Sequence, residues 1–282
     1  MASAELFQKL KARQRPLVMG ILNVTPDSFS DGGHYSQIDT ALEHAQSMLA
    51  EGADIIDVGG ESTRPGAGAV PGAEELQRVI PIIAALVNEL GAVVSVDTSK
   101  PEVMKAAIDV GAAMINDVQA LSAPGGMDIV ATADVLVCLM HMQGLPRTMQ
   151  AEPQYEDVVN DIIDFLKKRA EDCGSAGIEG NRIVIDPGFG FGKSLVHNYT
   201  LMRELERFSE LGYHVLVGMS RKSMIGMLLD NPVEKRLVGS VVLAALAAER
   251  GAAIVRAHDV RETVEAMRLV QAVQTFGLME EE

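Results

Sequence analysis

Eight short apolar runs recur along the chain, and their regular spacing limits the possible folds more than any other feature. Each run is continuous rather than alternating, as expected for parallel strands that are covered on both faces. The runs occupy residues 17–24, 53–60, 93–98, 114–118, 136–141, 183–188, 214–220 and 253–259. The segments between them have helical periodicity, and several begin near Pro or Asp and end just before Gly. We expect helices over residues 40–50, 74–90, 101–110, 155–176, 198–211, 235–250 and 261–276.

Eight strands that alternate with helices predict an α/β protein, a (β/α)8 TIM barrel in a single domain. A doubly wound open sheet shares this alternation, but no Gly-x-Gly-x-x-Gly follows the first run, and the count of eight suits closure. The 282 residues suggest two domains at about 150 residues each, yet α/β barrels reach about 250 residues as one domain. Because no linker or shift in composition divides the chain, we expect an N-terminal extension at 1–16, the barrel at 17–277 and an acidic tail at 278–282.

Composition and charge exclude several classes of protein. Asp and Glu number 39 against 24 Lys and Arg, and the net charge of −15 argues against a nucleic-acid binder or a polybasic membrane-surface protein. Two cysteines without a CxxC exclude a disulfide framework and a cysteine zinc site, and they fit a reducing compartment. The first residues lack the apolar core of a signal peptide, and the longest apolar run, 241–248, is far shorter than the roughly 20 residues that span a bilayer. We expect a soluble, cytoplasmic protein.

Polar residues end every predicted strand, and in a barrel these ends converge on one rim. They are Asn23, Asp57, Asp97, Asn116, His141, Asp186, the Ser220–Arg221–Lys222 segment, Arg256 and His258. A single member of this set could be a helix cap, but the whole set favours a ligand site. Buried carboxylates suit a ligand with paired N–H donors, and cations after the last two strands lie where barrels bind phosphate. The rim therefore predicts a ligand with a donor-rich ring at one end and an anion at the other.

Two Gly- and Ser-rich loops, residues 25–35 and 59–68, follow the first two predicted strands and are lid candidates. The segment 187–194 resembles a nucleotide-binding P-loop, but Pro occupies its first Gly position, so we do not expect nucleotide binding there. His141 and His258 have no third histidine at a matching strand end, so a histidine metal site is not predicted.

Motifs at these strand ends resemble the bacterial dihydropteroate synthase family. They include GILNVTPDSFSDGG at 20–33, DVGGESTRPGA at 57–67, DPGFGFGK at 186–193 and GMSRKSMIG at 218–226. Shorter matches lie at 95–103, 115–117, 138–144 and 256–260, so the resemblance covers residues 17–276. It implies a transferase of folate biosynthesis that condenses 6-hydroxymethyl-7,8-dihydropterin pyrophosphate with 4-aminobenzoate, giving 7,8-dihydropteroate and pyrophosphate.

The resemblance also implies roles for individual residues. The residues that it assigns to the pterin pyrophosphate are Thr63, Asp97, Asn116, Asp186, Lys222, Arg256 and His258, of which Asp97, Lys222, Arg256 and His258 are catalytic. Those that it assigns to the aminobenzoate pocket are Phe29, Thr63, Arg64, Pro65, Phe191, Lys222 and Ser223. Asn23 is the expected ligand of Mg²⁺, bound together with the pyrophosphate. The family implies a homodimer through its late helices, and the segment 237–248, which has almost no polar face, fits that expectation.

The expected chemistry is an S_N1-like substitution in which pyrophosphate leaves and an anionic Asp97 stabilises the cationic methylene group of the pterin. The aniline nitrogen that attacks is already a neutral nucleophile, so no general base is assigned. The main alternative is a pterin-binding methyltransferase barrel, which needs neither the pyrophosphate-binding cations nor the Ser-Thr-Arg-Pro loop. A phosphate-binding barrel lyase or isomerase and a catalytically inactive binding barrel are further alternatives.

Overall fold

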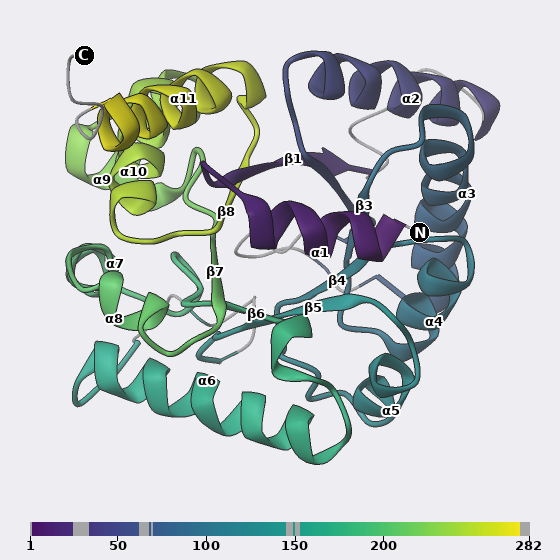
Figure 1. Cartoon of the computed structure of the whole chain (residues 1–282), viewed down its shortest axis with the longest axis horizontal. Helices are drawn as coiled ribbons and strands as arrows, with labels where there is room; N and C mark the ends of the chain where they lie inside the picture. The colour runs from purple at the N-terminus through teal and green to yellow at the C-terminus, as the bar shows by residue number, and fades with distance from the viewer. Residues whose placement is uncertain are drawn as a thin grey trace.

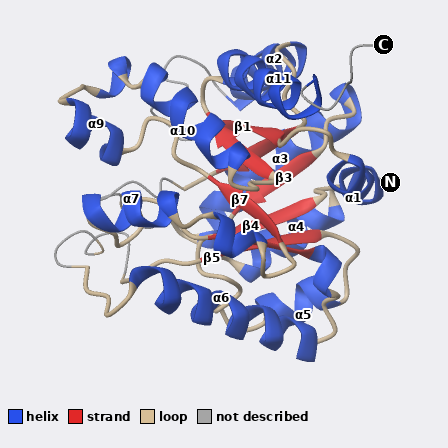
Figure 2. Cartoon of the chain, turned by 60° about the vertical axis from the view of Figure 1, so that its left-hand side comes forward, coloured by secondary structure: helices blue, strands red, loops and turns tan. Residues whose placement is uncertain are grey.

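Eight parallel strands close into a barrel in the computed structural model, which describes residues 2–24, 34–61, 68, 70–144, 149 and 153–276. The strands are hydrogen-bonded in chain order, and Figures 1 and 2 show them at the centre with helices around them. They are β1 (Leu17–Asn23), β2 (Ile55–Gly59), β3 (Val94–Asp97), β4 (Met114–Asp117), β5 (Leu136–Met140), β6 (Ile183–Asp186), β7 (His214–Val217) and β8 (Ile254–Ala257). The predicted single-domain (β/α)8 barrel is confirmed.

The helices lie between these strands in the expected places. They are α1 (Ala2–Ala12), α2 (His34–Ala50), α3 (Gly72–Leu90), α4 (Pro101–Asp109), α5 (Gly126–Ala131), α6 (Val158–Ser175), α7 (Leu195–Arg203), α8 (Glu206–Ser209), α9 (Ser223–Leu229), α10 (Leu237–Glu249) and α11 (Val260–Phe276). Two short 3-10 turns, Gly180–Arg182 and Val233–Lys235, precede β6 and α10. None of the helices in the described part of the chain is long and apolar enough to cross a membrane.

Several helices differ from the sequence-based prediction, and the helix expected over 40–50 already begins at His34. The single helix expected over 198–211 is two helices, α7 and α8, because the chain leaves helical geometry at Glu204. The helix expected from residue 155 begins at Val158, because the Asp157 carboxylate caps it by accepting hydrogen bonds from Val159 N and Asn160 N. The helices α5 and α9, of six and seven residues, were not predicted, since short helices carry little periodicity, and α1 lies in the segment 1–16, for which only an extension was predicted.

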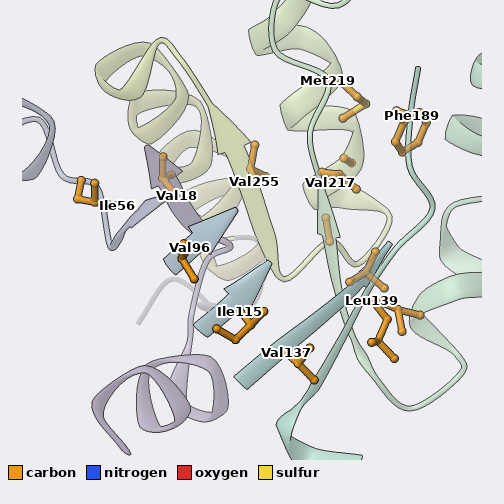
Figure 3. Close-up of a cluster of buried hydrophobic side chains, with 14 of the residues drawn as sticks. Val18, Ile56, Val96, Ile115, Val137, Leu139, Phe189, Val217, Met219 and Val255 are labelled. Carbon is orange, nitrogen blue, oxygen red and sulfur yellow. The ribbon is translucent and has the colours of Figure 1, made fainter. Parts of the chain in front are cut away.

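The strands bury apolar residues on both faces, which explains the continuous runs in the sequence. Outward-facing side chains pack beneath the helices, and Figure 3 shows Val18, Ile56, Val96, Ile115 and Val255 in that layer. Inward-facing side chains form a second cluster inside the barrel. Since successive side chains point to opposite faces, the parity of a residue in its strand decides whether it faces the barrel interior or the helices.

The N-terminal helix closes one end of the barrel, as Figure 1 shows. Leu6 and Leu10 are fully buried and pack against the inward-facing residues Met19, Ile55 and others of the interior cluster. With this end covered, only the opposite rim, at the C-terminal ends of the strands, remains for a ligand.

Replacing Leu6 by Ala is expected to lower the free energy of unfolding by about 2–5 kcal/mol, because it removes a fully buried side chain and leaves a cavity. Denaturant titration measures this loss. Lys11→Ala, at an exposed position of the same helix, is the control and is expected to change stability by less than about 0.5 kcal/mol. Equal stability of the two variants would show that α1 is not part of the core.

Candidate active site

Arg256 joins two carboxylates at the rim. Its side chain leaves β8 towards the barrel axis, and its Nε donates to Asp57 Oδ2 on β2 at 2.6 Å. Its Nη2 donates to Asp97 Oδ2 on β3 at 2.9 Å. The sequence places Arg256 among the cations expected to bind phosphate, and it does not indicate these contacts with the two carboxylates. Since a guanidinium has five N–H donors, donors remain for an anion above it.

Asp97, at the end of β3, is a buried carboxyl group whose pKa lies well above its usual range. Burial raises its pKa to about 7, and the negative charges of Asp57, Glu75 and Asp117 act in the same direction. The positive charge of Arg256 opposes the rise. A carboxyl group with a pKa close to neutral pH in a ligand-facing rim is typical of a functional site.

Asp186, at the end of β6, lies across the rim and is buried. Its Oδ1 accepts a hydrogen bond from Gly188 N at 2.7 Å. Burial raises the pKa of Asp186, while the charge of Lys222 lowers it. Gly188 adopts φ 72°, and a Cβ there would lie 1.9 Å from His141 O, so only glycine permits the turn that makes this bond.

Lys222 immediately precedes α9 and points back into the rim. Its Nζ donates to Phe189 O and lies 4.4 Å from the centre of the Phe191 ring. Burial lowers the pKa of Lys222 to about 8, and the charge of Asp186 opposes that shift. The Phe191 ring packs with Val118 and other apolar residues above β4 and β5. This corner therefore offers an apolar wall beside a carboxylate and an amine.

Asn116 and His258 complete the described part of the rim. The Asn116 amide is buried on β4, and its Nδ2 donates to Asp57 Oδ2 at 3.1 Å. His258 follows β8, and its Nδ1 lies 3.1 Å from Ser220 Oγ, which also accepts from His258 N at 3.1 Å. These contacts with Ser220 fix the orientation of the ring.

A magnesium ion finds few protein ligands here. Asn23 ends β1 beside Gly59, where a Cβ would lie 3.9 Å from both Asn23 Oδ1 and Asp97 Oδ2. Among the described residues no group of three His, Cys, Asp or Glu side chains could hold a metal ion. Mg²⁺ often binds through one or two protein oxygens together with substrate phosphates and water, and Asn23 fits that mode.

Some sequence expectations concern residues outside the rim or outside the described residues. His141 faces outwards from β5, where it packs edge-on against Phe165 and its Nδ1 lies 3.1 Å from Lys193 Nζ. Lys193 also donates to Phe191 O at 2.9 Å and is only 2% exposed. The lysine of the P-loop-like segment is therefore buried and hydrogen-bonded within the protein. The predicted residues Phe29, Thr63, Arg64 and Pro65 lie outside the described residues.

Arg221 also differs from the expectation that the cations after the last two strands lie together at an anion site. Its guanidinium forms an ion pair with Asp259 at the surface instead of joining the rim cations. Two further buried polar residues, Asp57 and Glu75, influence the rim although neither was among the predicted site residues. Asp57 is one of the polar residues that end the predicted strands, and this position in the sequence could have identified it as a residue that influences the site.

Comparisons with known proteins agree with this geometry. The family of pterin binding enzymes matches residues 19–258. Dihydropteroate synthase of Escherichia coli K12 is 53% identical over 257 residues, which are 91% of each chain. Dihydropteroate synthase of Xanthomonas albilineans, solved with 4-aminobenzoic acid, has a TM-score of 0.87 and 53% identity, covering 93% of this chain and 94% of that one. The Yersinia pestis dihydropteroate synthase in a sulfonamide drug complex has a TM-score of 0.88 and 52% identity, covering 93% and 95%.

A closed parallel barrel with charged side chains at the C-terminal ends of its strands is the arrangement typical of barrel enzymes. The chain belongs to the family of pterin-binding enzymes and, within it, to the bacterial dihydropteroate synthases, which are transferases.

Proposed function

We propose that this chain condenses 6-hydroxymethyl-7,8-dihydropterin pyrophosphate with 4-aminobenzoate, and that the rim residues described above carry the reaction. The observation that carries the proposal is the arrangement of Arg256 between Asp57 and Asp97, with Asp186 and Lys222 across the rim. It places donors for an anion beside carboxylates for a donor-rich ring. A folate methyltransferase barrel would not need this set of cations, and the relatives support the synthase.

The pterin ring is proposed to bind to Asp186, Asn116 and Asp97. An ionised carboxylate accepts two parallel hydrogen bonds from the guanidine-like edge of a pterin, and Asp186 retains Oδ2 for this purpose beside the bond from Gly188 N. Lys222 lies next to Asp186 and favours its ionised form. Thr63 is also assigned to this ligand.

The pyrophosphate is proposed to bind to Arg256 and His258 at the end of β8. Positive groups at this position stabilise the charge that develops as the pyrophosphate leaves. Mg²⁺, when bound through Asn23 and the phosphates, supplies further charge neutralisation. With the leaving group held in place, the ionised Asp97 stabilises the positive charge that forms on the methylene carbon.

The aminobenzoate is proposed to bind between Phe191, Lys222 and Ser223. Ser223 is exposed at the first turn of α9, and Phe191 forms part of the apolar wall. The remaining members of this pocket are Phe29, Thr63, Arg64 and Pro65. After the pyrophosphate has departed, the arylamine attacks the cationic methylene carbon and forms the C–N bond, and the amine releases its extra proton to solvent.

Release of pyrophosphate from synthetic hydroxymethyldihydropterin pyrophosphate, in the presence of Mg²⁺, tests the function directly. We expect release that depends on 4-aminobenzoate and gives dihydropteroate in equal amounts. Tight pterin binding without condensation would favour the methyltransferase or the inactive barrel. No pterin binding at all would reject the family assignment of the substrate.

We also propose a homodimer formed by α9, α10 and α11, which lie together in Figure 1. Their exposed large apolar residues are Met227, Leu228, Leu229, Val238, Val242, Leu246, Leu269, Val273 and Phe276. Exposed apolar surface of this extent is typical of a protein–protein interface. A cytoplasmic location is likewise proposed, because Cys138 and Cys173 are both free and buried, as suits a reducing compartment.

Val238→Glu is expected to convert the dimer to a monomer, because it places a charge on a side chain that is 73% exposed in the single chain and would be buried at the interface. Light scattering coupled to size-exclusion chromatography measures the mass. Val196→Glu, at a 72% exposed position on α7, is the matched control and is expected to leave the mass unchanged. A dimeric Val238→Glu variant would place the interface elsewhere.

A further inference from the structure

Asp57 is assigned no contact with either substrate in the reaction proposed above, although its fully buried carboxylate lies beneath the rim. One oxygen, Oδ2, accepts hydrogen bonds from Arg256 Nε at 2.6 Å and from Asn116 Nδ2 at 3.1 Å. These two donors come from β8 and β4, and Asp57 itself lies on β2. A single buried oxygen therefore joins two residues that the proposed reaction assigns to the substrate.

We propose that Asp57 is a positioning residue, which fixes the Arg256 guanidinium and the Asn116 amide in the orientation that binds pterin pyrophosphate. The inference rests on the proposed function. Asp57 touches no substrate in this proposal and acts through Arg256 and Asn116.

For Arg256, the two carboxylates set the plane of the guanidinium. Nε is held by Asp57 and Nη2 by Asp97, and these acceptors lie on adjacent strands of the barrel. Two anchor points on a planar group leave it no free rotation about its long axis. The remaining N–H donors then face in one direction, which is the condition for strong binding of a charged leaving group.

For Asn116, the carboxylate decides which amide atom faces the ligand. An ionised carboxylate only accepts hydrogen bonds, so Asn116 must present its nitrogen to Asp57. The amide oxygen is thereby turned away from Asp57 and is available to accept a hydrogen bond from an N–H group of the pterin. Without Asp57 the amide could turn over and present the wrong atom.

Stability alone does not account for a charge at this position. Asp57 Oδ1 is buried and has no hydrogen-bond partner among the described residues, so the carboxylate is only partly satisfied. Replacing a buried ion pair by well-packed apolar residues is often neutral or stabilising. The hydrogen bonds of Asp57 go to two side chains that are proposed to bind the substrate. We therefore explain this buried carboxylate by its effect on the orientation of those two side chains.

Asp57→Asn tests the proposal, since it keeps the size of the side chain and removes its charge. In the intact enzyme we expect the dissociation constant of pterin pyrophosphate to rise about 10- to 100-fold, the range typical of losing a supporting partner. The KM for 4-aminobenzoate is expected to stay within about threefold, because the hydrogen bonds of Asp57 go to Arg256 and Asn116 and to none of Phe191, Lys222 and Ser223, the described residues of the proposed aminobenzoate pocket. Calorimetric titration and steady-state kinetics measure the two quantities.

The pH profile gives a readout that a merely structural role would not change. The charged groups that act on Asp97 are Arg256, Asp57, Glu75 and Asp117, and Lys222 lies near enough for Asp97 to affect its pKa. Because the Asp57 charge raises the pKa of Asp97, its removal lowers that pKa. The acid limb of kcat/KM for the pterin substrate, near pH 7 in the wild type, is expected to move to lower pH in Asp57→Asn.

Ser95→Ala is the matched control, because Ser95 pairs with Asp57 in the register of β2 and β3 and its buried hydroxyl has no partner among the described residues. The Ser95→Ala variant is expected to bind pterin pyrophosphate with wild-type affinity. If Asp57→Asn does not fold, Asp57→Ser, which leaves space for water, carries the same test. Wild-type pterin affinity with an unmoved acid limb in the folded Asp57 variant, or an equal loss in Ser95→Ala, would overturn the proposal. A wild-type enzyme without turnover would instead reject the proposed function.

Discussion

Asp186→Asn is expected to weaken binding of the pterin pyrophosphate severely. The substitution replaces a carboxylate that is proposed to accept two charge-assisted hydrogen bonds from the pterin by an amide that presents a donor to a donor, and each such bond contributes about 1.5–3 kcal/mol. Two bonds amount to a loss of about 10²- to 10⁴-fold in affinity. The fold is expected to persist, because the amide oxygen can still accept the hydrogen bond from Gly188 N. Calorimetric titration of the substrate onto the variant measures the loss.

A suitable control for Asp186→Asn is Asp157→Asn, which changes a carboxylate at the N-terminus of α6, away from the rim. Asparagine caps helices about as well as aspartate, so neither stability nor affinity is expected to change much. An Asp186→Asn variant that binds the pterin with wild-type affinity would contradict the proposed role of this carboxylate.

Arg256→Met is expected to have the second large effect, and it acts on both stability and activity. The variant keeps an aliphatic side chain but leaves the Asp57 and Asp97 carboxylates without their shared cation. Breaking one partner of a buried ion pair costs about 3–5 kcal/mol in the free energy of unfolding, and the pyrophosphate contact is lost as well. Denaturant titration and the pyrophosphate-release assay measure the two losses.

The pKa of Asp97 determines how the stability of Arg256→Met changes with pH. Since Arg256 lowers the pKa of Asp97, removing it raises that pKa beyond its wild-type value of about 7. Asp97 then takes up a proton more readily in the folded than in the unfolded chain, so the variant loses stability as the pH rises from 5 to 8. Its stability deficit is therefore expected to be smaller at pH 5, where protonation removes one of the unpaired charges.

Arg221→Met is the matched control for stability, because Arg221 also pairs with an aspartate but does so at the surface, with Asp259. An exposed ion pair contributes at most about 1 kcal/mol. If both variants lost the same free energy of unfolding, the ion pairs of Arg256 at the rim would contribute no more to stability than the surface ion pair of Arg221.

The barrel was predictable from the sequence because its signals are local. Continuous apolar runs, helical periodicity and glycines after the helices fall in chain order, and each predicted strand is present within a few residues of its expected bounds. The break between α7 and α8 was missed because the apolar spacing continues across it. The helix α1 lies outside the strand–helix repeat and was left as an extension.

Two features of the candidate site could not be read from the sequence. His141 and Asp186 both end predicted strands, yet His141 faces outwards to Phe165 and Lys193. A shift of one residue along a strand turns a side chain to the opposite face, and strands that are apolar on both faces do not show which parity is inward. The partners of Arg256 depend on the register of strands 159 and 199 residues away along the chain.

The sequence by itself therefore determined the fold class, the single domain and the rim on which polar groups collect, because strand ends in a closed parallel barrel must meet. Only the tertiary structure decided which of those groups meet. It turned Arg256 towards the carboxylates of Asp57 and Asp97, and it buried Lys193, whose Nζ donates to Phe191 O. These outcomes depend on strand register, on inward or outward parity and on the free energy of burying charge, and each of these is a property of the closed barrel and not of any one segment.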